Sequence, residues 1–348
     1  MDALVLPSRS FESIINAKIL QMNGYDVIGA SSTNDENLGG NFKKIVKIPY
    51  VYDSFFDDFI LDFLQKNKFK IIVACHNVIY SHLTELFDAR KIDIKLVKSL
   101  FGIYGFEGSY LDLLSDFYDQ SDFLGTIIPK KTYQSLLSKA FSIHGQSNIE
   151  KLNTLIQIIP SLPPGDLVEI GSLEGRTAFL IGWLARKFKI GKLLCIDPWE
   201  ESYALQNDSP SVLLNTTKRL NWDNIKNHFI FNLVDCFYED LNYRIGTIDD
   251  IANKFGGPFS ISTEEFGETK FSGFISFLHI DGNHDYEFVL NDINNCSEYI
   301  KEGGCIVFDD YEWNFGDGPK KVADEFCLKN KNKITKTIKS GGALFVLF

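Results

Sequence analysis

The stretch that decides the fold is Leu167-Val-Glu-Ile-Gly-Ser-Leu-Glu-Gly-Arg-Thr-Ala-Phe-Leu180. Residues 167–170 form a short, mainly apolar run of the kind that a buried parallel strand uses. Gly171 and Gly175 frame a turn, where a side chain would keep a ligand away from the backbone. The residues after the turn begin a helix. The stretch therefore predicts a strand, a ligand-binding turn and a helix.

The charge at this turn narrows the choice of ligand. Glu169 places a carboxylate beside the glycines, and a carboxylate suits a phosphate group poorly. It suits a ligand that carries a cationic amino group and ribose hydroxyls. S-adenosylmethionine is a ligand of this type.

Size and charge set the class of protein. With 348 residues, 45% of them hydrophobic, the chain has room for two domains with full cores. Its formal net charge of -11 argues against nucleic acid or an anionic membrane surface as a partner, since both favour a basic face. A substrate of nucleotide size stays compatible with this charge.

The cysteines and the N-terminal residues indicate a cytoplasmic protein. The six cysteines are scattered and form no C-x-x-C pair, which is typical of core residues in a reducing compartment. Residues 1–7 lack the basic region and the long apolar core of a signal peptide. No apolar run is long enough to span a bilayer.

Residues 1–125 are predicted to form a Rossmann-like domain. Strands are expected at 3–6, 26–30, 44–48 and 71–75, with helices after Ser8-Arg-Ser10, at 53–66 with an N-cap near Asp53 or Ser54, and at 80–87. The order "ALVLPSRS…MNGYDVIGASS…KIPYVYDS…ILDFLQKNKFKIIVA" resembles the domain that precedes the ATP-binding core of ATP-grasp enzymes. Ser8, Arg9 and Ser10 could bind an anion of a substrate or nucleotide, or they could simply cap a helix in a structural domain.

Residues 126–348 are predicted to form the second domain, with most of its strands ending in an acid. After the opening stretch come strands at 192–197, ending in Asp197, at 228–234, followed by Asp235, at 274–280, followed by Asp281, and at 305–308, followed by Asp309 and Asp310. Helices are expected at 131–141, 148–159, 176–188 and 285–300, the last of them ended by Gly303-Gly304. Residues 333–348 read as an antiparallel hairpin with a glycine turn.

The fold class is therefore α/β, with two Rossmann-like domains. The C-terminal one is a doubly wound, mostly parallel sheet with a terminal antiparallel hairpin. Ligands of such sheets bind beyond the carboxyl ends of the strands, so the acids should meet there. Asp197 follows the first glycine at about the interval expected of a ribose-binding acid.

Asp281, Asp309 and Asp310 are expected to converge and to hold a divalent cation. Three carboxylates in one crevice repel each other unless they are protonated, paired or bound to a cation. Oxygen ligands favour magnesium or manganese over zinc. The alternative is that these acids only cap strand ends and contact the cofactor, without a metal.

The second domain resembles class I S-adenosylmethionine-dependent methyltransferases. Within these it is similar to the often metal-dependent group that methylates sugars and other small acceptors. Five motifs carry the resemblance: "VEIGSLEGRTAF" at 168–179, "CIDPW" at 195–199, "LHIDGNHDY" at 278–286, "GGCIVFDDY" at 303–311 and "GPKKVADEF" at 318–326.

The resemblance implies a role for each cofactor-binding residue. Glu169, Gly171, Ser172 and Gly175 would cradle the methionine end of S-adenosylmethionine. Asp197 would hold the ribose, Trp199 would border the adenine and Asp235 would lie near the adenine amine. Asp281 is also expected among the cofactor-binding residues.

The spacing of Asp281, His284, Asp309 and Asp310 resembles the metal and base positions of catechol-type O-methyltransferases. His284 stands where that group has lysine, and histidine is a suitable base near neutral pH. We expect His284 or Asp281 to remove the acceptor proton; the alternative for His284 is a helix cap. His279 is interpreted as a core histidine.

Two segments are candidates for shaping the acceptor pocket. Residues 246–272 are longer than the connection needs, and we interpret them as an acceptor-binding lid or as a contact in a homo-oligomer. Residues 312–318 follow the acidic pair, and their Trp313 could stack on a sugar ring or serve packing alone.

The leading hypothesis is methylation of an oxygen of a small polar acceptor, such as a sugar or nucleotide-sugar-like group of a surface glycan or natural product. A phosphate or phosphoramidate acceptor in capsule modification is a variant. A nicotinamide-dependent oxidoreductase is disfavoured by the missing G-x-G-x-x-G and the terminal hairpin. A non-catalytic nucleotide-binding protein is disfavoured by the acids at the strand ends.

Overall fold

The computed structural model describes residues 2–33, 41–98, 114–121, 124–206, 209–313 and 315–348, and these form two compact units. One comprises Met1–Asp119 with Pro210–Thr216, and the other Gln120–Ser209 with Thr217–Phe348. Over these described residues, we find no helix with the length and apolar character that a membrane crossing needs.

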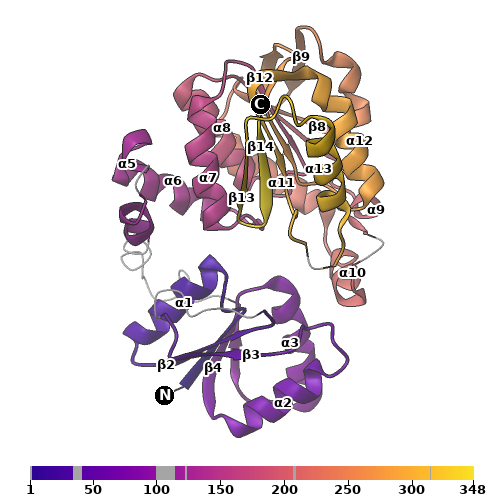
Figure 1. Ribbon diagram of the computed structural model, residues 1–348. Helices are drawn as coiled ribbons and strands as arrows, with labels where there is room; N and C mark the ends of the chain where they lie inside the picture. The colour runs from indigo at the N-terminus through magenta and orange to yellow at the C-terminus, as the bar shows by residue number, and fades with distance from the viewer. Residues whose placement is uncertain (1, 34–40, 99–113, 122–123, 207–208, 314) are drawn as a thin grey trace. The chain divides into compact units, whose positions relative to one another are not determined.

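The first unit is built on a five-stranded parallel sheet (Figure 1). Its strand order is β3-β2-β1-β4-β5. The elements are β1 (Asp2–Leu6), α1 (Phe11–Met22), β2 (Asp26–Ser31), β3 (Lys44–Lys47), α2 (Phe56–Lys66), β4 (Phe69–Ala74), α3 (Asn77–Arg90) and β5 (Lys95–Val97). Apolar residues of α2 and α3 share one core with alternate residues of the central strands. The predicted parallel βαβ arrangement is confirmed.

The structure shows how the first two helices of this unit begin. The Ser10 side chain accepts a hydrogen bond from the Ser13 backbone N–H, so Ser10 is the N-cap of α1. The predicted N-cap of α2 was wrong. The N-cap residue is Phe55, and the Asp53 carboxylate instead accepts a hydrogen bond from the Tyr50 N–H. Asp53 belongs to the turn before the helix.

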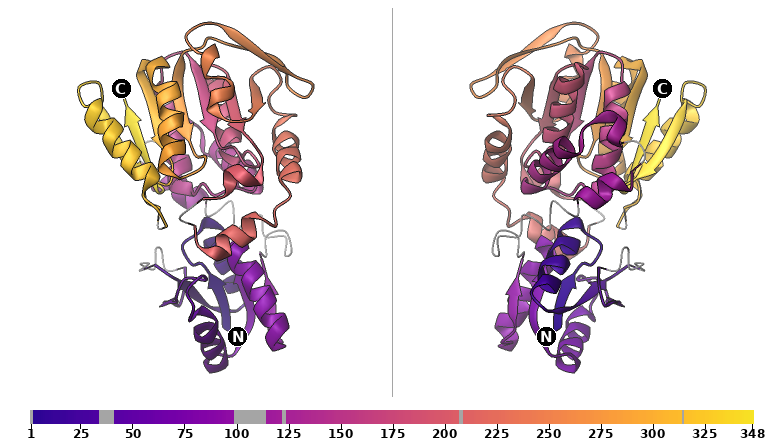
Figure 2. Two further views of the ribbon diagram at one scale, coloured as in Figure 1. Left: turned by 90° about the vertical axis from the view of Figure 1, so that its right-hand side faces the viewer. Right: turned by 90° about the vertical axis from the view of Figure 1, so that its left-hand side faces the viewer.

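The second unit contains a seven-stranded sheet in the order β13-β14-β12-β11-β6-β7-β8. Its strands are β6 (Asp166–Ile170), β7 (Leu193–Asp197), β8 (Leu241–Ile245), β11 (Ile275–Ile280), β12 (Ile300–Phe308), β13 (Lys336–Ser340) and β14 (Ala343–Leu347). β14 pairs antiparallel with β12, while the five strands from β12 to β8 are parallel. Figure 2 shows the yellow C-terminal strands at one edge of this sheet. The predicted fold class is confirmed.

Helices cover both faces of this sheet (Figure 1). They are α5 (Leu124–Ile127), α6 (Lys130–Ser142), α7 (Ile149–Ile158), α8 (Arg176–Phe188), α9 (Glu201–Ala204), α11 (Trp222–Leu233), α12 (Tyr286–Cys296) and α13 (Gly318–Lys329), while α10 (Ser211–Thr217) lies largely with the first unit. α7 and α8 lie on one side, and α12 and α13 on the other. Because side chains alternate along a strand, Val168 and Ile170 pack toward α12, whereas Glu169 points to the opposite face.

Two sequence predictions for this unit were wrong. Residues 228–233 belong to helix α11, and Val234 is its C-cap. Ile225, Phe229 and Leu233 form a buried stripe at helical spacing, and the Asn221 side chain caps the first turn. Gly303-Gly304 lie inside strand β12 rather than ending a helix; α12 stops at Cys296. In the first case a short apolar run was compatible with either period.

The segment at 246–272 begins at the carboxyl end of β8, but its hairpin lies at the opposite end of the sheet, which does not fit a lid over the acids. It carries two short 3₁₀ turns (Ile248–Asp250 and Ala252–Lys254) and the hairpin β9 (Phe259–Thr263) and β10 (Gly267–Phe271). Asp166, the first residue of β6, accepts hydrogen bonds from the Ser272 and Gly273 N–H groups. Asn242 near the start of β8 donates to the Ile261 and Gly267 carbonyls. These contacts place the hairpin at the amino ends of the strands, opposite the acids (Figure 1).

Gly171 allows the ends of β6 and β11 to approach closely. Its φ is +83°, and a Cβ built on it would lie 2.1 Å from the Asp281 carbonyl oxygen. The sequence had suggested that a ligand needs this space, but the adjacent chain segment fills it. Gly171 is therefore required for packing the two strand ends that carry the site.

We predict that Gly171→Ala lowers the free energy of unfolding by about 3 kcal/mol or more, since backbone strain and a backbone clash add. Gly342→Ala is the matched control, because Gly342 has a φ of +89° but no atom within 4 Å of a Cβ. It should cost only about 1 kcal/mol. Urea unfolding measures both, and equal losses would show that the clash is absent.

Asp292 is an acid in the buried stripe of α12 that sequence periodicity did not predict. Burial, with the nearby charge of Asp249, raises the pKa of Asp292 to about 8. In the unfolded chain its pKa should be about 4. Between these values the folded state binds more protons, so this residue's contribution to stability is present below about pH 4 and is lost as the pH rises to about 8.

We predict that Asp292→Asn stabilises the protein at pH 8 by more than about 1 kcal/mol and leaves its stability nearly unchanged at pH 4. The amide has nearly the shape of the acid and does not ionise. Thermal melts of both proteins across this range measure the difference. A constant offset at all pH values would contradict the assigned pKa.

Candidate functional site

The turn after β6 is tied to the end of β7 by a single carboxylate. Asp197 Oδ2 accepts from the backbone N–H of Ser172 at 2.8 Å and of Leu173 at 3.0 Å, and Oδ1 accepts from the Trp199 N–H at 2.7 Å. Burial raises the pKa of Asp197, while these three N–H groups act in the opposite direction. A carboxylate has about four lone-pair sites, so it retains capacity for a further donor.

An aromatic cluster supports this turn from below. The buried Trp199 ring packs against Phe229 and Tyr243, with ring centroids 4.9 and 5.8 Å apart. Its indole N–H donates to the Leu173 carbonyl at 2.8 Å. Gly175, with a φ of +91°, starts helix α8 beside Phe229. Ser172, Asp197 and Trp199 are thus brought together, as the sequence indicated.

Asp235 does not join this group. It follows helix α11, is exposed, and accepts a hydrogen bond from the neighbouring Cys236 thiol. The strand next to β7 is β8, in which Ile245 pairs with Asp197 and the following Gly246 N–H donates to the Asp197 carbonyl. The residues beside the turn at this strand end are therefore Gly246 and Thr247. Placing Asp235 at a strand end was wrong because 228–233 is helical.

Glu169 and His279 form a buried pair beneath the sheet's carboxyl edge. They are register partners in β6 and β11, and both are fully buried. His279 Nδ1 lies 3.1 Å from Glu169 Oε1, and the Ser172 hydroxyl donates to Glu169 Oε2 at 2.7 Å. The Glu169 carboxylate is therefore engaged inside the protein rather than aimed at open space.

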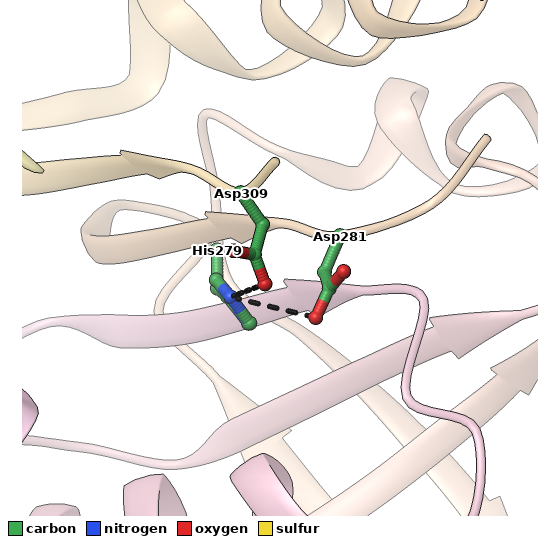
Figure 3. A group of neighbouring side chains, drawn as sticks. All are labelled: His279, Asp281 and Asp309. Carbon is green, nitrogen blue, oxygen red and sulfur yellow. Dashed lines mark ion pairs between the residues drawn. The ribbon is translucent and has the colours of Figure 1, made fainter. Parts of the chain in front are cut away.

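The other nitrogen of His279 faces two of the predicted acids. Nε2 lies 3.5 Å from Asp309 Oδ2 and 3.8 Å from Asp281 Oδ2 (Figure 3). By hydrogen-bond geometry this buried nitrogen has no partner among the described residues. Burial opposes the charged ring, yet Asp309 and Glu169 raise the pKa of His279 to about 9. His279 belongs to the acid cluster and is not only a core residue.

Lys151 of α7 adds a buried cation to the same cluster. Its Nζ contacts Asp309 Oδ2 and lies 3.6 Å from Asp281 Oδ2, while its side chain is 3% exposed. Burial works against the charge of Asp309, but Lys151 and His279 hold the pKa of this acid well below its usual range. Burial and the charge of Asp309 raise the pKa of Asp281 well above its usual range. The pKa values of the two acids are therefore shifted in opposite directions.

Asp310 and His284 form a second pair on the other side of Asp281. His284 Nε2 lies 2.9 Å from Asp310 Oδ2. Burial opposes protonation of the ring, but the hydrogen bond and charge of Asp310 raise the pKa of His284. The Trp313 ring meets the His284 ring edge to face at 5.1 Å and Phe315 at 4.8 Å. Among the described residues, neither His284 Nδ1 nor Trp313 Nε1 has a hydrogen-bond partner.

Two groups of side chains here could each hold a metal ion. One is His279, Asp281 and Asp309, and the other is Asp281, His284 and Asp310, each with ligand atoms within 4.8 Å of one another. Asp281 belongs to both. The structure thus brings together Asp281, His284, Asp309 and Asp310, as the spacing in the sequence indicated. The metal itself stays a prediction.

Sequence reasoning missed Lys151 and the role of His279. A lysine in an amphipathic helix normally reaches solvent, so nothing in the pattern marked Lys151. His279 and Glu169 did carry a signal: each is a polar residue in an otherwise apolar buried strand, one position before the strand's end. Parallel pairing of those strands could have suggested their contact.

Comparisons with known proteins agree with this arrangement. A family model described as a methyltransferase domain matches residues 168–311. The uncharacterized protein R132 of Acanthamoeba polyphaga mimivirus is 29% identical over 145 residues, which cover 42% of this chain and 51% of that protein. The chain thus spans about half the length of this curated relative.

Similar solved structures include three methyltransferases. The O-methyltransferase NovP is 18% identical, with a TM-score of 0.43, over 57% of this chain and 80% of that chain. The TDP-rhamnose 3'-O-methyltransferase CalS11 is 11% identical, with a TM-score of 0.36, over 69% and 93%. An O-methyltransferase from Bacillus cereus, in complex with SAH, is 13% identical, with a TM-score of 0.31, over 72% and 95%.

The family match covers the glycine turn, the end of β7 and every acid of the cluster. It spans the five parallel strands of the sheet, from β6 to β12, and ends before the antiparallel strands β13 and β14. The second unit of this chain therefore contains a region, residues 168–311, that matches a methyltransferase domain.

Proposed function

We propose that this protein transfers a methyl group from S-adenosylmethionine to an oxygen of a small polar acceptor. The acceptor is a sugar or a nucleotide-sugar-like group used in making a surface glycan or a natural product. The observation that carries this proposal is the convergence of Asp281, His284, Asp309 and Asp310 at the sheet edge that also carries the glycine turn of the methyltransferase domain.

The turn fits the methyl donor. The donor supplies an electrophilic methyl group on a sulfonium. Asp197 sits at the strand end beside the turn with lone pairs left for ribose hydroxyls, and Trp199 gives the turn an aromatic support. The Ser172 hydroxyl links the turn that would hold the donor to the buried Glu169–His279 pair.

An oxygen acceptor must lose a proton, and of the two expected bases, His284 and Asp281, the contacts of His284 support a role as the base. When His284 Nε2 carries the hydrogen that faces Asp310, its Nδ1 keeps a lone pair. That nitrogen is buried and lacks a partner among the described residues. Asp310 thus orients the ring and stabilises the cation that forms, in the manner of a base held by a carboxylate.

The acids also fit a divalent cation, magnesium or manganese. Asp281 and Asp310, with Asp309 beside them, supply the oxygen donors that such ions favour. When bound there, the ion would supply positive charge that lowers the pKa of an acceptor hydroxyl. Holding donor and acceptor in contact is the larger contribution of the chain, up to roughly 7–11 kcal/mol.

Trp313 supports a sugar-like acceptor. Its ring lies against His284 and Phe315, so it borders the place where the base works. Its indole N–H is buried and has no partner among the described residues, which leaves a donor for an acceptor oxygen. An aromatic face with a polar edge suits a sugar ring, which has apolar faces and hydroxyl edges.

For the donor site, we predict that Asp197→Asn weakens binding of S-adenosylhomocysteine at least about tenfold, since one charge-assisted contact and its hold on the turn are lost. Asp235→Asn is the control and should bind like the unaltered protein, because Asp235 lies outside the turn. Calorimetry measures both, with NAD as a second ligand. Tight binding of NAD without a response to S-adenosylhomocysteine would reject the proposed function.

For the acceptor site, we predict that Asp281→Asn lowers methyl transfer at least about a hundredfold but changes S-adenosylhomocysteine affinity less than about threefold. The assay is release of S-adenosylhomocysteine during incubation with a panel of sugars and nucleotide sugars. Asp292→Asn, a buried acid of the same unit outside the cluster, should keep its activity. An active Asp281→Asn enzyme would remove this acid from the mechanism.

A further inference from the structure

We infer that Lys151 is a built-in cation of the acceptor site, which competes with a divalent cation for Asp309 and Asp281. The inference rests on the proposed function, because it concerns the metal of that site. Three observations carry it: the position of the ammonium, its burial, and the way the fold holds its helix.

The Lys151 ammonium lies beside the carboxylates whose negative charge a metal ion would otherwise have to balance. Lys151 Nζ contacts Asp309 Oδ2 and lies 3.6 Å from Asp281 Oδ2, the acid that both candidate metal groups share. His279 approaches the same two oxygens from within the sheet. The oxygen of Asp309 that faces the cluster is therefore already bound to a cation of the chain.

Burial makes this contact strong. The side chains of Lys151 and Asp309 are 3% and 8% exposed, so solvent screens their attraction little. An acid left alone in such a place carries a large penalty, which either a lysine or a metal ion can relieve. Lysine and metal therefore substitute for one another here, and each weakens the binding of the other.

The terminal hairpin holds Lys151 in place. Gly341, in the turn between β13 and β14, approaches so closely that a Cβ on it would lie 2.7 Å from the Lys151 Cβ and backbone nitrogen. Asn148 donates to the Gly341 carbonyl at 3.1 Å and accepts from the Lys151 N–H at 3.0 Å. Thr154 also bonds to Ser340 at 2.7 Å. The first turn of α7 is thereby fixed against the sheet, and its lysine with it.

The arrangement divides the acids. Lys151 takes Asp309, whereas Asp310 faces His284 and lies in the metal group without Asp309. A divalent cation then depends mainly on Asp281 and Asp310. The affinity of the site for this cation is therefore lower than three free carboxylates would provide. An acceptor oxygen then becomes more important as an additional ligand of the cation.

The test is manganese binding, measured by calorimetry and by thermal melts in chelator and in manganese, without any acceptor. Lys151→Met removes the charge and keeps the length of the side chain. We expect it to bind manganese at least about tenfold more tightly than the unaltered protein, because a repelling charge a few ångströms away is gone. Its melting temperature should fall in chelator and rise further with manganese than that of the unaltered protein.

Two control variants accompany this test: one keeps the positive charge at position 151, and the other removes a lysine elsewhere in the same unit. Lys151→Arg retains the cation and should bind manganese like the unaltered protein. Lys192→Met breaks the Lys192–Asp240 ion pair, which is 2.5 Å long and belongs to the same unit. It should leave manganese affinity unchanged. Lys151→Met binding manganese no more tightly than these proteins, or no binding in any of them, would overturn the inference.

A second comparison covers the case in which Lys151→Met fails to fold. Asp309→Asn and the double variant Lys151→Met/Asp309→Asn both lack the buried acid, so neither leaves it unpaired. We expect the double variant to bind manganese more tightly than Asp309→Asn, since Lys151 no longer competes for Asp281. Equal affinities would refute competition by the lysine.

The same samples separate this inference from the proposed function. S-adenosylhomocysteine binds at the glycine turn, so its affinity should be alike in all variants. Absence of that binding in the unaltered protein would reject the methyltransferase proposal whatever the manganese result. Normal binding combined with a failed manganese comparison would reject only the role of Lys151.

Discussion

The parallel pairing of β6 with β11 is the constraint on which the rest of the site depends. In this register Glu169 lies beside His279 and Ile170 beside Ile280, so the two strands end together. The Asp281 N–H then donates to the Ile170 carbonyl at 2.8 Å, and the Asp309 N–H to the Ile280 carbonyl at 2.9 Å. Each acid directly follows its own strand, and its backbone N–H is held by the last carbonyl of the neighbouring strand. A shift of one residue would turn these side chains to the other face.

Alternation along the strands sorts polar from apolar residues in the core. The face toward α12 and α13 receives a continuous apolar cluster, whereas the opposite face takes Glu169 and His279. Two ionisable groups inside a sheet are costly unless they meet. Their contact with Ser172 on one side, and their approach to Asp309 on the other, give a chain of polar groups from the donor turn to the acid cluster. Methyl transfer needs those two places side by side.

The terminal hairpin has a structural task at the site. β14 extends the sheet antiparallel beside β12, and its turn holds the first turn of α7. In the sequence analysis this hairpin served only as an argument against a nicotinamide-dependent oxidoreductase. In the structure it positions Lys151, which comes from a helix more than a hundred residues before the acids it contacts. The β9–β10 hairpin, in contrast, is fixed at the amino ends of the strands, away from the chemistry.

The sequence by itself determined the α/β class and the position of the glycine turn, Asp197, Asp281, Asp309 and Asp310 at the ends of strands, because local periodicity and strand ends are properties of short segments. It misassigned 228–234, and Asp235 with it, because a short apolar run fits a helix as well as a strand. Only the tertiary structure decided that Lys151 and His279 join the acids, that Gly171 serves the approach of Asp281, and that Asp292 is buried. These are contacts between distant segments, which depend on register and on helix placement, and no local pattern encodes either.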